Sequence, residues 1–546
     1  MKSYHKLLFP LLLASLLCGC TVSVGGNANS KQTGESSQAS SAADQQTGNS
    51  GAVSDSGIRI DANMPMLVIE TVSQDPNVMD FIKKPVAGHV SKLIASWTPG
   101  YTIPPEPYYE ACKVYMTTAK DSGTPAAVDA DVKVRGNWTT NYDKKPLKLK
   151  FAEKTSLAQL ADGEGFKNWL LLAGYKDGSL LRDKTALSIA REILKPDGLF
   201  ASDAALTEVT VNGEYQGVYL LAEPIQVSPR RVSITKPEQD YQGTDIGYLL
   251  EFDGYFYNEE PLHQFHVEYA DNAPLLAYNP GGKEKEVKCL PEGGSSVKND
   301  VGMTIKSDIY SQAQHDFIAS YVNNVYNIMY AAAYEDKAYQ FNADFSEITE
   351  TKDLTPQQAV EQVVNVDSLA DAYIMAELTC DADIYWSSFY MDADFGPDGD
   401  KRLTFEAPWD FDSSMGNKDR CIDGTGFYAG SIVPDVDGYN YRTINPWLAV
   451  LMHEDWYQDV IREKWTRAYD NGVFTRAIEG IEADKNMFSD AFARNYQKWD
   501  NIIHNEAFEQ ELSGPAKKCK TQAEAADFLK DWLTKRVDFL NGAWHS

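Results

Sequence analysis

The hydrophobic pattern of the chain changes its period near residue 307, and this change restricts the possible folds more than any other feature. Before that point apolar and polar residues tend to alternate, a period of two that is typical of half-buried β-strands. After it, apolar residues recur with a period near 3.6, as on the buried face of α-helices. The sequence therefore predicts an α+β protein with a strand-rich N-terminal half and a helical C-terminal half.

The predicted strands of the N-terminal half are short and separated by turn residues. They are expected at 64–71, 110–118, 128–135, 146–151, 206–211, 217–223 and 246–253, with a compact apolar run at 167–175. Asn212-Gly213 signals a two-residue hairpin turn, because both residues tolerate positive φ. In 146–151 apolar residues alternate with Lys148 and Lys150, so one face of that strand should be buried and the other should present two ammonium groups.

The predicted helices begin with 179–194, where Ser179 is the expected N-cap and Lys195-Pro196-Asp197-Gly198 the stop. Further helices are expected at 308–335, 366–379, 445–471, 474–506 and 521–541. Residues 253–306 are rich in Gly, Pro and Asn and are predicted to form a loop-rich insertion.

The N-terminus predicts a membrane anchor. Basic residues precede an apolar run at 7–17 that is too short for an ordinary membrane span, and Leu17-Cys18-Gly19-Cys20 resembles a bacterial lipobox. We therefore expect residues 1–20 to be a lipoprotein signal peptide, with cleavage before Cys20 and lipidation of its thiol. Residues 21–57 contain almost no large apolar side chains and predict a flexible linker to a domain at 58–546. The chain should then be extracytoplasmic and meet the membrane only through its lipid.

The overall charge and the cysteines exclude several classes of protein. The formal net charge is −29, from 79 acidic and 50 basic residues. This balance argues against a nucleic-acid partner, since such binding depends on Lys and Arg at phosphates. The five cysteines beyond the lipobox are scattered, without CxxC spacing, so neither a disulfide framework nor a zinc site is expected, although one incidental bridge is possible.

A pair of carboxylates follows a predicted short strand at 403–405 and the break at Pro408. If the segment is extended, Asp410 and Asp412 lie on one side and their aromatic neighbours face the core. Mg²⁺ prefers such oxygen ligands and commonly takes one or two carboxylates together with substrate phosphates. The pattern predicts a divalent-metal site; the alternative is a polar turn anchored by a buried Trp.

Phosphoryl transfer from a nucleotide needs cations for the phosphates, a carboxylate for the metal and another to orient the attacking group. Four elements provide this inventory: Arg135-Gly136-Asn137, the strand with Lys148 and Lys150, Asp381-Ala382-Asp383, and Asp410-Phe411-Asp412. Their order, a lysine followed by two separate aspartates, is the order found in protein kinases.

Seven short motifs between 134 and 412 carry a more specific resemblance, which runs over nearly the whole globular part, from about 64 to 540. In chain order they are Val134-Arg135-Gly136-Asn137, Lys145-Pro146-Leu147-Lys148-Leu149-Lys150-Phe151, Asn168-Trp169-Leu170-Leu171-Leu172, Leu180-Leu181-Arg182-Asp183, Val211-Asn212-Gly213-Glu214-Tyr215-Gln216-Gly217-Val218-Tyr219-Leu220, Gly247-Tyr248-Leu249-Leu250-Glu251 and Trp409-Asp410-Phe411-Asp412. With these motifs in this order, the chain resembles the spore-coat CotH kinase family. The resemblance implies an atypical, two-lobed protein-kinase-like fold and ATP-dependent phosphorylation of Ser or Thr in a secreted or surface protein, with Mg²⁺ or Mn²⁺.

The resemblance also implies roles for the acidic residues. Asp410 is the expected metal ligand, assisted by Asp412, and Asp383 is the expected catalytic-loop carboxylate that accepts or positions the proton of the acceptor hydroxyl. Asp381 is the alternative for that catalytic role. Glu223, at the end of a predicted hairpin, is expected near the adenine, unless it is a surface residue.

The basic residues are assigned in the same way. Lys148 is the expected phosphate-binding lysine, with Lys150 a near-equal candidate on the same strand face; alternatively, both simply solvate that face. Arg182 is expected to pair with phosphate or with Asp410, and its alternative role is a structural ion pair.

One departure from kinases leaves the activity open. Kinase catalytic loops carry an Asn a few residues after the catalytic Asp as a second metal ligand, whereas this chain has Ser387 and Ser388 there. A hydroxyl is a poorer Mg²⁺ ligand, so the alternative function is a catalytically degenerate surface-binding or scaffold protein. A glycosidase that uses Asp410 and Glu406 is a third, weaker hypothesis.

Overall fold

The computed structural model describes residues 64–73, 109–118, 125–136, 138–280, 285–289, 301–419, 422–431, 444–506 and 508–546. All of these residues belong to one compact unit. The predicted signal peptide with Cys20, the linker at 21–57 and Asn137 lie outside the described residues.

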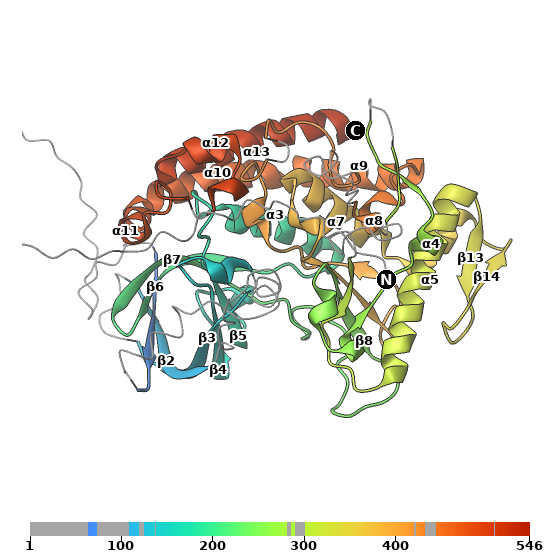
Figure 1. The fold of residues 1–546 in the computed structure, drawn as a ribbon, viewed down its shortest axis with the longest axis horizontal. Coiled ribbons are helices and arrows are strands. Elements are labelled where there is room, and N and C mark those ends of the chain that lie inside the picture. Colours follow the sequence, from blue (N-terminus) through green and yellow to red (C-terminus); the bar gives the residue numbers. More distant parts are fainter. Residues whose placement is uncertain are drawn as a thin grey trace, which may run out of the picture. The chain divides into compact units, whose positions relative to one another are not determined.

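In the described part of the N-terminal half, seven strands close into a barrel with the order β1-β2-β3-β4-β5-β7-β6 (Figure 1). They are β1 (Met66–Thr71), β2 (Glu110–Thr117), β3 (Val128–Val134), β4 (Leu147–Thr155), β5 (Phe166–Leu172), β6 (Ala204–Val211) and β7 (Glu214–Ala222). Parallel pairing of β1 with β6 closes the barrel, while its other neighbours are antiparallel. Closure pairs the edges that an open sheet would expose.

The inside of the barrel is filled by the apolar residues that the alternation predicts. Leu147, Leu149 and Phe151 of β4 are buried there with Trp169 of β5. The predicted hairpin turn is confirmed: Asn212 and Gly213 have φ values of 50° and 76°, as a two-residue turn with right-handed strand twist requires.

The helix that follows the barrel strand β5 is α3 (Arg182–Leu194). The predicted N-cap, Ser179, is wrong. Instead, the Asp177 carboxylate accepts hydrogen bonds from the backbone N–H groups of Ser179, Leu181 and Arg182 at 2.9–3.0 Å. A carboxylate can satisfy several N–H groups at the start of a helix and complements the positive end of the helix dipole.

A second sheet has the order β16-β15-β8-β12-β9. Its strands are β8 (Gly247–Asp253), β9 (Gln264–Phe265), β12 (Gly302–Ile305), β15 (Phe389–Asp394) and β16 (Thr404–Phe405). Because β9 and β12 belong to this sheet, the stretch at 253–306 is not only a loop-rich insertion, as predicted, but also contributes strands to the core. The same stretch also holds α4 (Tyr269–Asn272) and the two-stranded pair β10 (Leu275–Leu276) and β11 (Glu286–Val287).

The C-terminal half is helical, as predicted. It contains α5 (Gln312–Glu335), α6 (Pro356–Val363), α7 (Val366–Thr379), α8 (Pro446–Ala449), α9 (Asp455–Asp470), α10 (Val473–Met487), α11 (Ser489–Trp499), α12 (Gly514–Lys518) and α13 (Gln522–Trp544), with a small hairpin of β13 (Ala338–Phe341) and β14 (Ile348–Thr351). The two long helices expected at 445–471 and 474–506 are each divided into two. The largest core joins the second sheet to these helices.

The barrel and the helices interlock through α11, which lies beside β7 in Figure 1. Asn495 of α11 accepts a hydrogen bond from the Val218 backbone, and the Trp499 indole donates to the Gln216 carbonyl. Gly217 between them has a φ of 103°, and a Cβ at that position would lie 2.5 Å from the Asn495 side chain. The helix therefore sits directly on the strand backbone.

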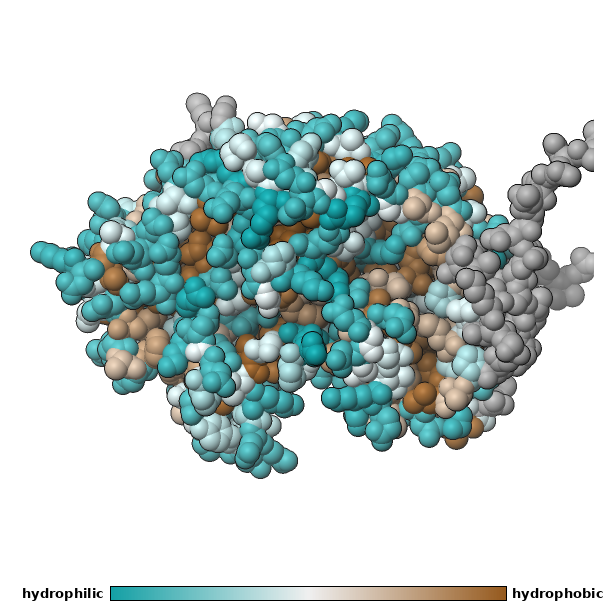
Figure 2. All heavy atoms as spheres, turned by 180° about the vertical axis from the view of Figure 1, so that it is seen from behind, coloured by the Kyte–Doolittle hydropathy of each residue, from teal (hydrophilic) through white to brown (hydrophobic). Residues whose placement is uncertain are grey.

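The described surface seen in Figure 2 is mostly hydrophilic, with smaller hydrophobic areas between the polar side chains. Within the described residues, none of the helices combines the length and the apolar composition needed to span a membrane.

Candidate functional site

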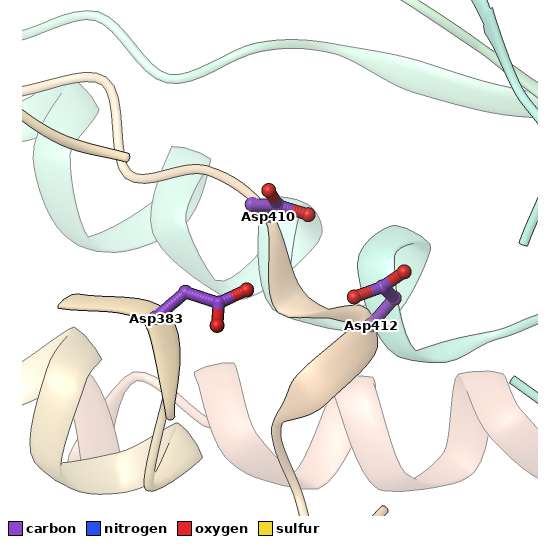
Figure 3. Close-up of side chains that lie close together, drawn as sticks. All are labelled: Asp383, Asp410 and Asp412. Carbon is purple, nitrogen blue, oxygen red and sulfur yellow. The ribbon is translucent and has the colours of Figure 1, made fainter. Parts of the chain in front are cut away.

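Three carboxylates predicted from separate parts of the sequence come together. Asp383, Asp410 and Asp412 each offer an oxygen within 4.8 Å of the others. In Figure 3 their side chains point toward a common space from two turns of the chain. Asp383 begins the short 3₁₀ turn η8 (Asp383–Tyr385) after α7, and Asp412 lies within η9 (Phe411–Ser413) after β16.

The two aspartates of the Asp-x-Asp motif meet through a turn and not through a strand. Asp410 has a φ of 71° and a ψ of 61°, in the left-handed region, so the prediction of an extended segment is wrong. The predicted burial of Trp409 and Phe411 is confirmed, with 7% and 2% exposure. Phe411 donates its backbone N–H to Asp183 at 2.8 Å, which fixes the turn against the start of α3. Asp410 is therefore held in a conformation that non-glycine residues rarely adopt.

Burial and mutual repulsion make this an unfavourable place for negative charge. Burial, followed by the charges of Asp412 and Asp383, raises the pKa of Asp410 to about 7. Burial also raises the pKa of Asp412, and it raises the pKa of Asp183 well above its ordinary value, with Asp412 and Asp410 adding to the effect. Asp183 is thus a fourth carboxylate of the cluster, although in the sequence it stands out only as part of a motif.

Lys176 is the cation that sequence reasoning missed. Its ammonium lies 3.0 Å from Asp412 Oδ1 and donates to Ser413 Oγ at 2.6 Å, and its side chain is only 8% exposed. Burial favours the neutral amine, but Asp412 and the neighbouring acids raise the pKa of Lys176 well above its ordinary value. A single lysine in a turn after β5 has no periodic or motif signal that would have identified it.

Arg135 supplies a second positive charge at the cluster. Burial lowers the pKa of its guanidinium, while the charges of Asp410 and Asp183 oppose that effect. Arg135 directly follows β3, and its N–H bonds the carbonyl of Pro146 at 3.0 Å, so the end of the barrel carries it to the carboxylates. The predicted convergence of the Arg135 loop with the aspartates therefore occurs in the structure.

Lys148 and Lys150 lie on the outer face of β4 at different distances along the barrel from Arg135. Lys148 is paired in register with Lys133, two residues before Arg135, whereas Lys150 is paired with Asp131. Lys148 is half-buried, and its pKa is lowered by burial and by the charges of Lys133 and Arg135. Lys150 is exposed, with its ammonium 6.0 Å from the Tyr109 ring centroid. Of the two, Lys148 is closer in register to Arg135.

The structure does not bring Arg182 to the three aspartates. Its guanidinium is 1% exposed and forms an ion pair with Asp177, and it lies over the Phe528 ring at 5.8 Å. The expectation of a phosphate or Asp410 partner is therefore corrected to the alternative role, a structural ion pair. The physical reason is local: Asp177 caps α3, and the first residue of that helix is held against its cap.

Glu223 is neither a surface residue nor open toward a nucleotide. It is 1% exposed, Arg231 donates to it at 3.1 Å, and it accepts a hydrogen bond from the Asp203 backbone at 3.1 Å. Its pKa is raised by burial, against the lowering effect of that backbone bond and of Arg231. The predicted position near adenine is thus replaced by a buried ion pair at the end of β7.

Two further residues of the catalytic-loop region have defined positions. Asp381, the alternative catalytic residue, is buried and accepts a hydrogen bond from the Asp383 backbone at 2.9 Å, so it shapes the turn that presents Asp383. The Ser388 hydroxyl donates to Asp410 at 3.4 Å and thus reaches the cluster where kinases place an asparagine.

Glu406, the glycosidase candidate, instead accepts a hydrogen bond from the Phe200 backbone and lies beside Asp392.

This arrangement fits a divalent cation. Asp383, Asp410 and Asp412 offer hard oxygen ligands from buried or half-buried positions. Burial raises the pKa values of Asp410 and Asp412, with neighbouring carboxylates adding to the effect, so a bound cation would favour their ionised forms. Arg135 lies on the barrel side of the same cluster, and Lys148 lies near Arg135, so the two can bind an anionic group such as phosphate.

Comparison with known proteins agrees with this chemistry. A protein-family model described as CotH kinase protein matches residues 132–540, which is most of the chain. No match was found among curated proteins.

Proposed function

We propose that this chain, which belongs to the CotH kinase protein family, transfers the γ-phosphate of ATP to Ser or Thr of a secreted or surface protein. The observation that carries the proposal is the convergence of Asp383, Asp410 and Asp412 beside Lys176 and Arg135. Metal-binding carboxylates, a carboxylate for the acceptor and cations for phosphate are the parts that phosphoryl transfer uses.

Metal binding, phosphate binding and proton acceptance fall to different residues of the site. Asp410 and Asp412 would hold Mg²⁺ or Mn²⁺, which when bound neutralises charge on the transferred phosphoryl group. Arg135 and Lys148 bind phosphate oxygens from the barrel side. Asp383 accepts a hydrogen bond from the acceptor hydroxyl, orients its oxygen toward the γ-phosphorus and takes its proton as the new P–O bond forms and ADP leaves.

We also propose that the barrel and the helical part act like the two lobes of a kinase. In support, the phosphate-binding candidates come from the barrel strands, and the carboxylates come from the turns after α7 and β16. The lipobox at Cys20 supports an extracytoplasmic location, with a lipid anchor in a bacterial membrane.

The test measures label from γ-labelled ATP in a generic acceptor protein, with Mg²⁺ or Mn²⁺ and the full chain. Asp410→Asn keeps the shape of the side chain, and Asp398→Asn, on the exposed turn between β15 and β16, is the matched control. Label is expected from wild type and Asp398→Asn and should be lost in Asp410→Asn. A folded wild type that binds ATP without transferring label would refute the kinase activity.

Such a result would support the second candidate, a scaffold protein that binds nucleotide or surface partners without catalysis. The observation that favours it is Ser388, whose hydroxyl stands beside Asp410 where an asparagine ligand would serve the second metal. Ser388→Asn is the variant that separates the two, because it should create label if that ligand alone is missing.

A further inference from the structure

Glu511 lies at the junction of three segments that are far apart in the chain. Its carboxylate accepts hydrogen bonds from the Tyr142 hydroxyl, at 2.8 Å to either oxygen, and from the Trp138 indole at 3.1 Å. The Lys176 ammonium lies 3.7 Å away on its other side. We refer to Trp138, Tyr142, Lys176 and Glu511 as the clamp.

The residues of the clamp contact two different parts of the candidate site. The Lys176 ammonium lies 3.0 Å from Asp412 Oδ1. Trp138 and Tyr142 belong to the connection between β3 and β4, which begins with Arg135 beside Asp410. Glu511 therefore links the phosphate-binding side of the site to one of its metal-binding carboxylates.

The clamp has its own small core, separate from the large ones. Tyr142, Phe508 and Leu512 form a distinct buried cluster against which Tyr175 packs. The rings of Tyr142 and Tyr175 are stacked at 5.5 Å, and Tyr175 directly precedes Lys176. These residues therefore pack with one another and not with the barrel interior.

Hydrogen bonds tie the same unit to the turn that carries Asp412. Asn417 donates to the carbonyl oxygens of Lys176 and Asp412 at 3.2 and 2.8 Å, and its own carbonyl accepts from the Ser513 backbone at 2.7 Å. Asn417 thus connects the Asp412 turn, the Lys176 turn and the segment after Glu511 directly.

From this geometry we infer that Glu511 is a positioning residue that couples metal binding at Asp412 to phosphate binding at the Arg135 loop. Glu511 shares the Lys176 ammonium with Asp412, so Asp412 keeps an oxygen available for a cation. It also holds the 138–142 segment in place, so Arg135 stays beside Asp410. The nucleotide part of this inference rests on the proposed function.

The test uses the full chain and two variants with different chemistry. Glu511→Gln removes the charge at constant shape, and Tyr142→Phe removes only one hydroxyl without changing any charge. Glu509→Gln is the matched control, because Glu509 is an exposed carboxylate in the same short turn, η11 (Glu509–Glu511). Thermal melting of each variant shows that it is folded.

The first measurement is the affinity for Mn²⁺ alone, followed by the paramagnetic signal of the free ion. Without the Glu511 charge, Lys176 pairs fully with Asp412 and competes with the cation. We expect binding at least threefold weaker in Glu511→Gln and unchanged in Glu509→Gln. Equal affinity in these two variants would overturn the inference, whether or not the chain binds nucleotide.

The second measurement is the factor by which Mn²⁺ increases the affinity for ADP. A merely structural role would weaken both ligands and leave this factor unchanged. We expect the factor to fall at least fivefold in Glu511→Gln and in Tyr142→Phe, and an unchanged factor in both would contradict the coupling. A wild type that binds Mn²⁺ but no ADP would refute the proposed function, while the Mn²⁺ comparison would still decide the role of Glu511 at Asp412.

Discussion

Replacing Asp410 by Asn should stabilise the protein in the absence of metal while abolishing its activity. Burial and two neighbouring carboxylates raise the pKa of Asp410 from 3.8 to about 7 in the folded protein. A group with a raised folded-state pKa contributes stability below its unfolded pKa, and that stability is lost as the pH rises through the folded pKa. Wild type should therefore lose stability between about pH 4 and pH 7, and the Asn variant should be spared this loss.

The size of the effect follows from the same pKa. A rise from 3.8 to about 7 corresponds to about 4 kcal/mol, at about 1.4 kcal/mol per tenfold change in proton affinity. This is an upper bound, because Asp410 is partly exposed and solvent screens its interactions; the attraction to Arg135 and Lys176 is already contained in the pKa of about 7. We expect the Asn variant to be more stable than wild type by roughly 1–3 kcal/mol at pH 8, and about equal to it near pH 4.

The assay is urea unfolding of both proteins in a chelating buffer at pH 4 and pH 8, repeated at pH 8 with Mn²⁺. Added Mn²⁺ should stabilise wild type, because a ligand that binds only the folded state shifts the equilibrium, and it should stabilise the variant much less. The order of stability should therefore reverse when the metal is present.

One result would refute this reasoning. If the Asn variant is less stable than wild type at pH 8 in chelator, the ionised Asp410 carboxylate is a net structural contact, and attraction to Arg135 outweighs burial and repulsion. A variant that is unfolded at both pH values would refute it equally.

Three other predictions concern buried or cationic groups. Burial raises the pKa of Glu406, beside Asp392, to about 7, so the wild-type protein loses stability as the pH rises through 7. In urea unfolding, the advantage of Glu406→Gln over wild type should grow by roughly 1–2 kcal/mol between pH 5.5 and pH 8.5. A constant difference would contradict this prediction. In equilibrium titrations, Lys148→Met should weaken ATP binding about tenfold and Lys150→Met less than threefold, because only Lys148 adjoins the Arg135 end of the barrel. The reverse order would assign the phosphate-binding role to Lys150. Arg182→Met should lower the free energy of unfolding by roughly 3–5 kcal/mol, since it leaves a buried carboxylate unpaired, and should leave the ATP affinity of the folded fraction unchanged.

Local patterns were sufficient for most of the individual elements. Alternation in β4 predicted which side chains fill the barrel, and Asn212-Gly213 predicted the hairpin turn. Barrel closure was not predictable in this way, because it depends on pairing between segments far apart in the chain. The hydrogen bond from the Thr71 backbone to the Asn212 side chain, which helps to join the two edges, spans 141 residues.

The second sheet was only partly predicted for a different reason. Its strand β15 (Phe389–Asp394) carries Asp392 and Asp394 and is buried over most of its length, so it shows neither clear alternation nor a continuous apolar run. Similarly, β12 is four residues long and lies in a stretch rich in turn residues. Both β15 and β12 are strands because they pair with β8, which lies between them in the sheet. Their own sequences carry no clear strand pattern.

The residues of the candidate site also differ in whether local sequence could predict them. Asp410 and Asp412 were found because they are close in sequence, and Asp383 because its order in the chain follows kinases. Lys176 contacts Ser413 across 237 residues and stands alone in a turn. The two wrong positions, Arg182 and Glu223, share one cause: each forms an ion pair with a nearby residue, Asp177 or Arg231, which a pattern of isolated charges does not reveal.

Comparison with another pair of buried acids explains why the cation is placed at Asp410 and Asp412. Glu251 and Asp253 also lie close together, but Lys306 is 3.0 Å from Glu251 and the Thr304 hydroxyl donates to Asp253 at 3.0 Å. Each acid of that pair thus has a partner within the fold, although burial and the charge of Glu251 raise the pKa of Asp253 to about 7 as well. The difference at Asp410 is therefore the number of carboxylates and not the pKa of any one of them.

The cluster around Asp410 is balanced less well. Four carboxylates, including Asp183 and Asp383, meet the charges of Lys176 and Arg135, and Asp410 is in addition held at a φ of 71°. Like charges gathered in a partly buried site destabilise a fold, and a strained residue adds to that effect. Where local rules are broken together in this way, function is the usual reason, and a divalent cation is the ligand that would restore the balance of charge.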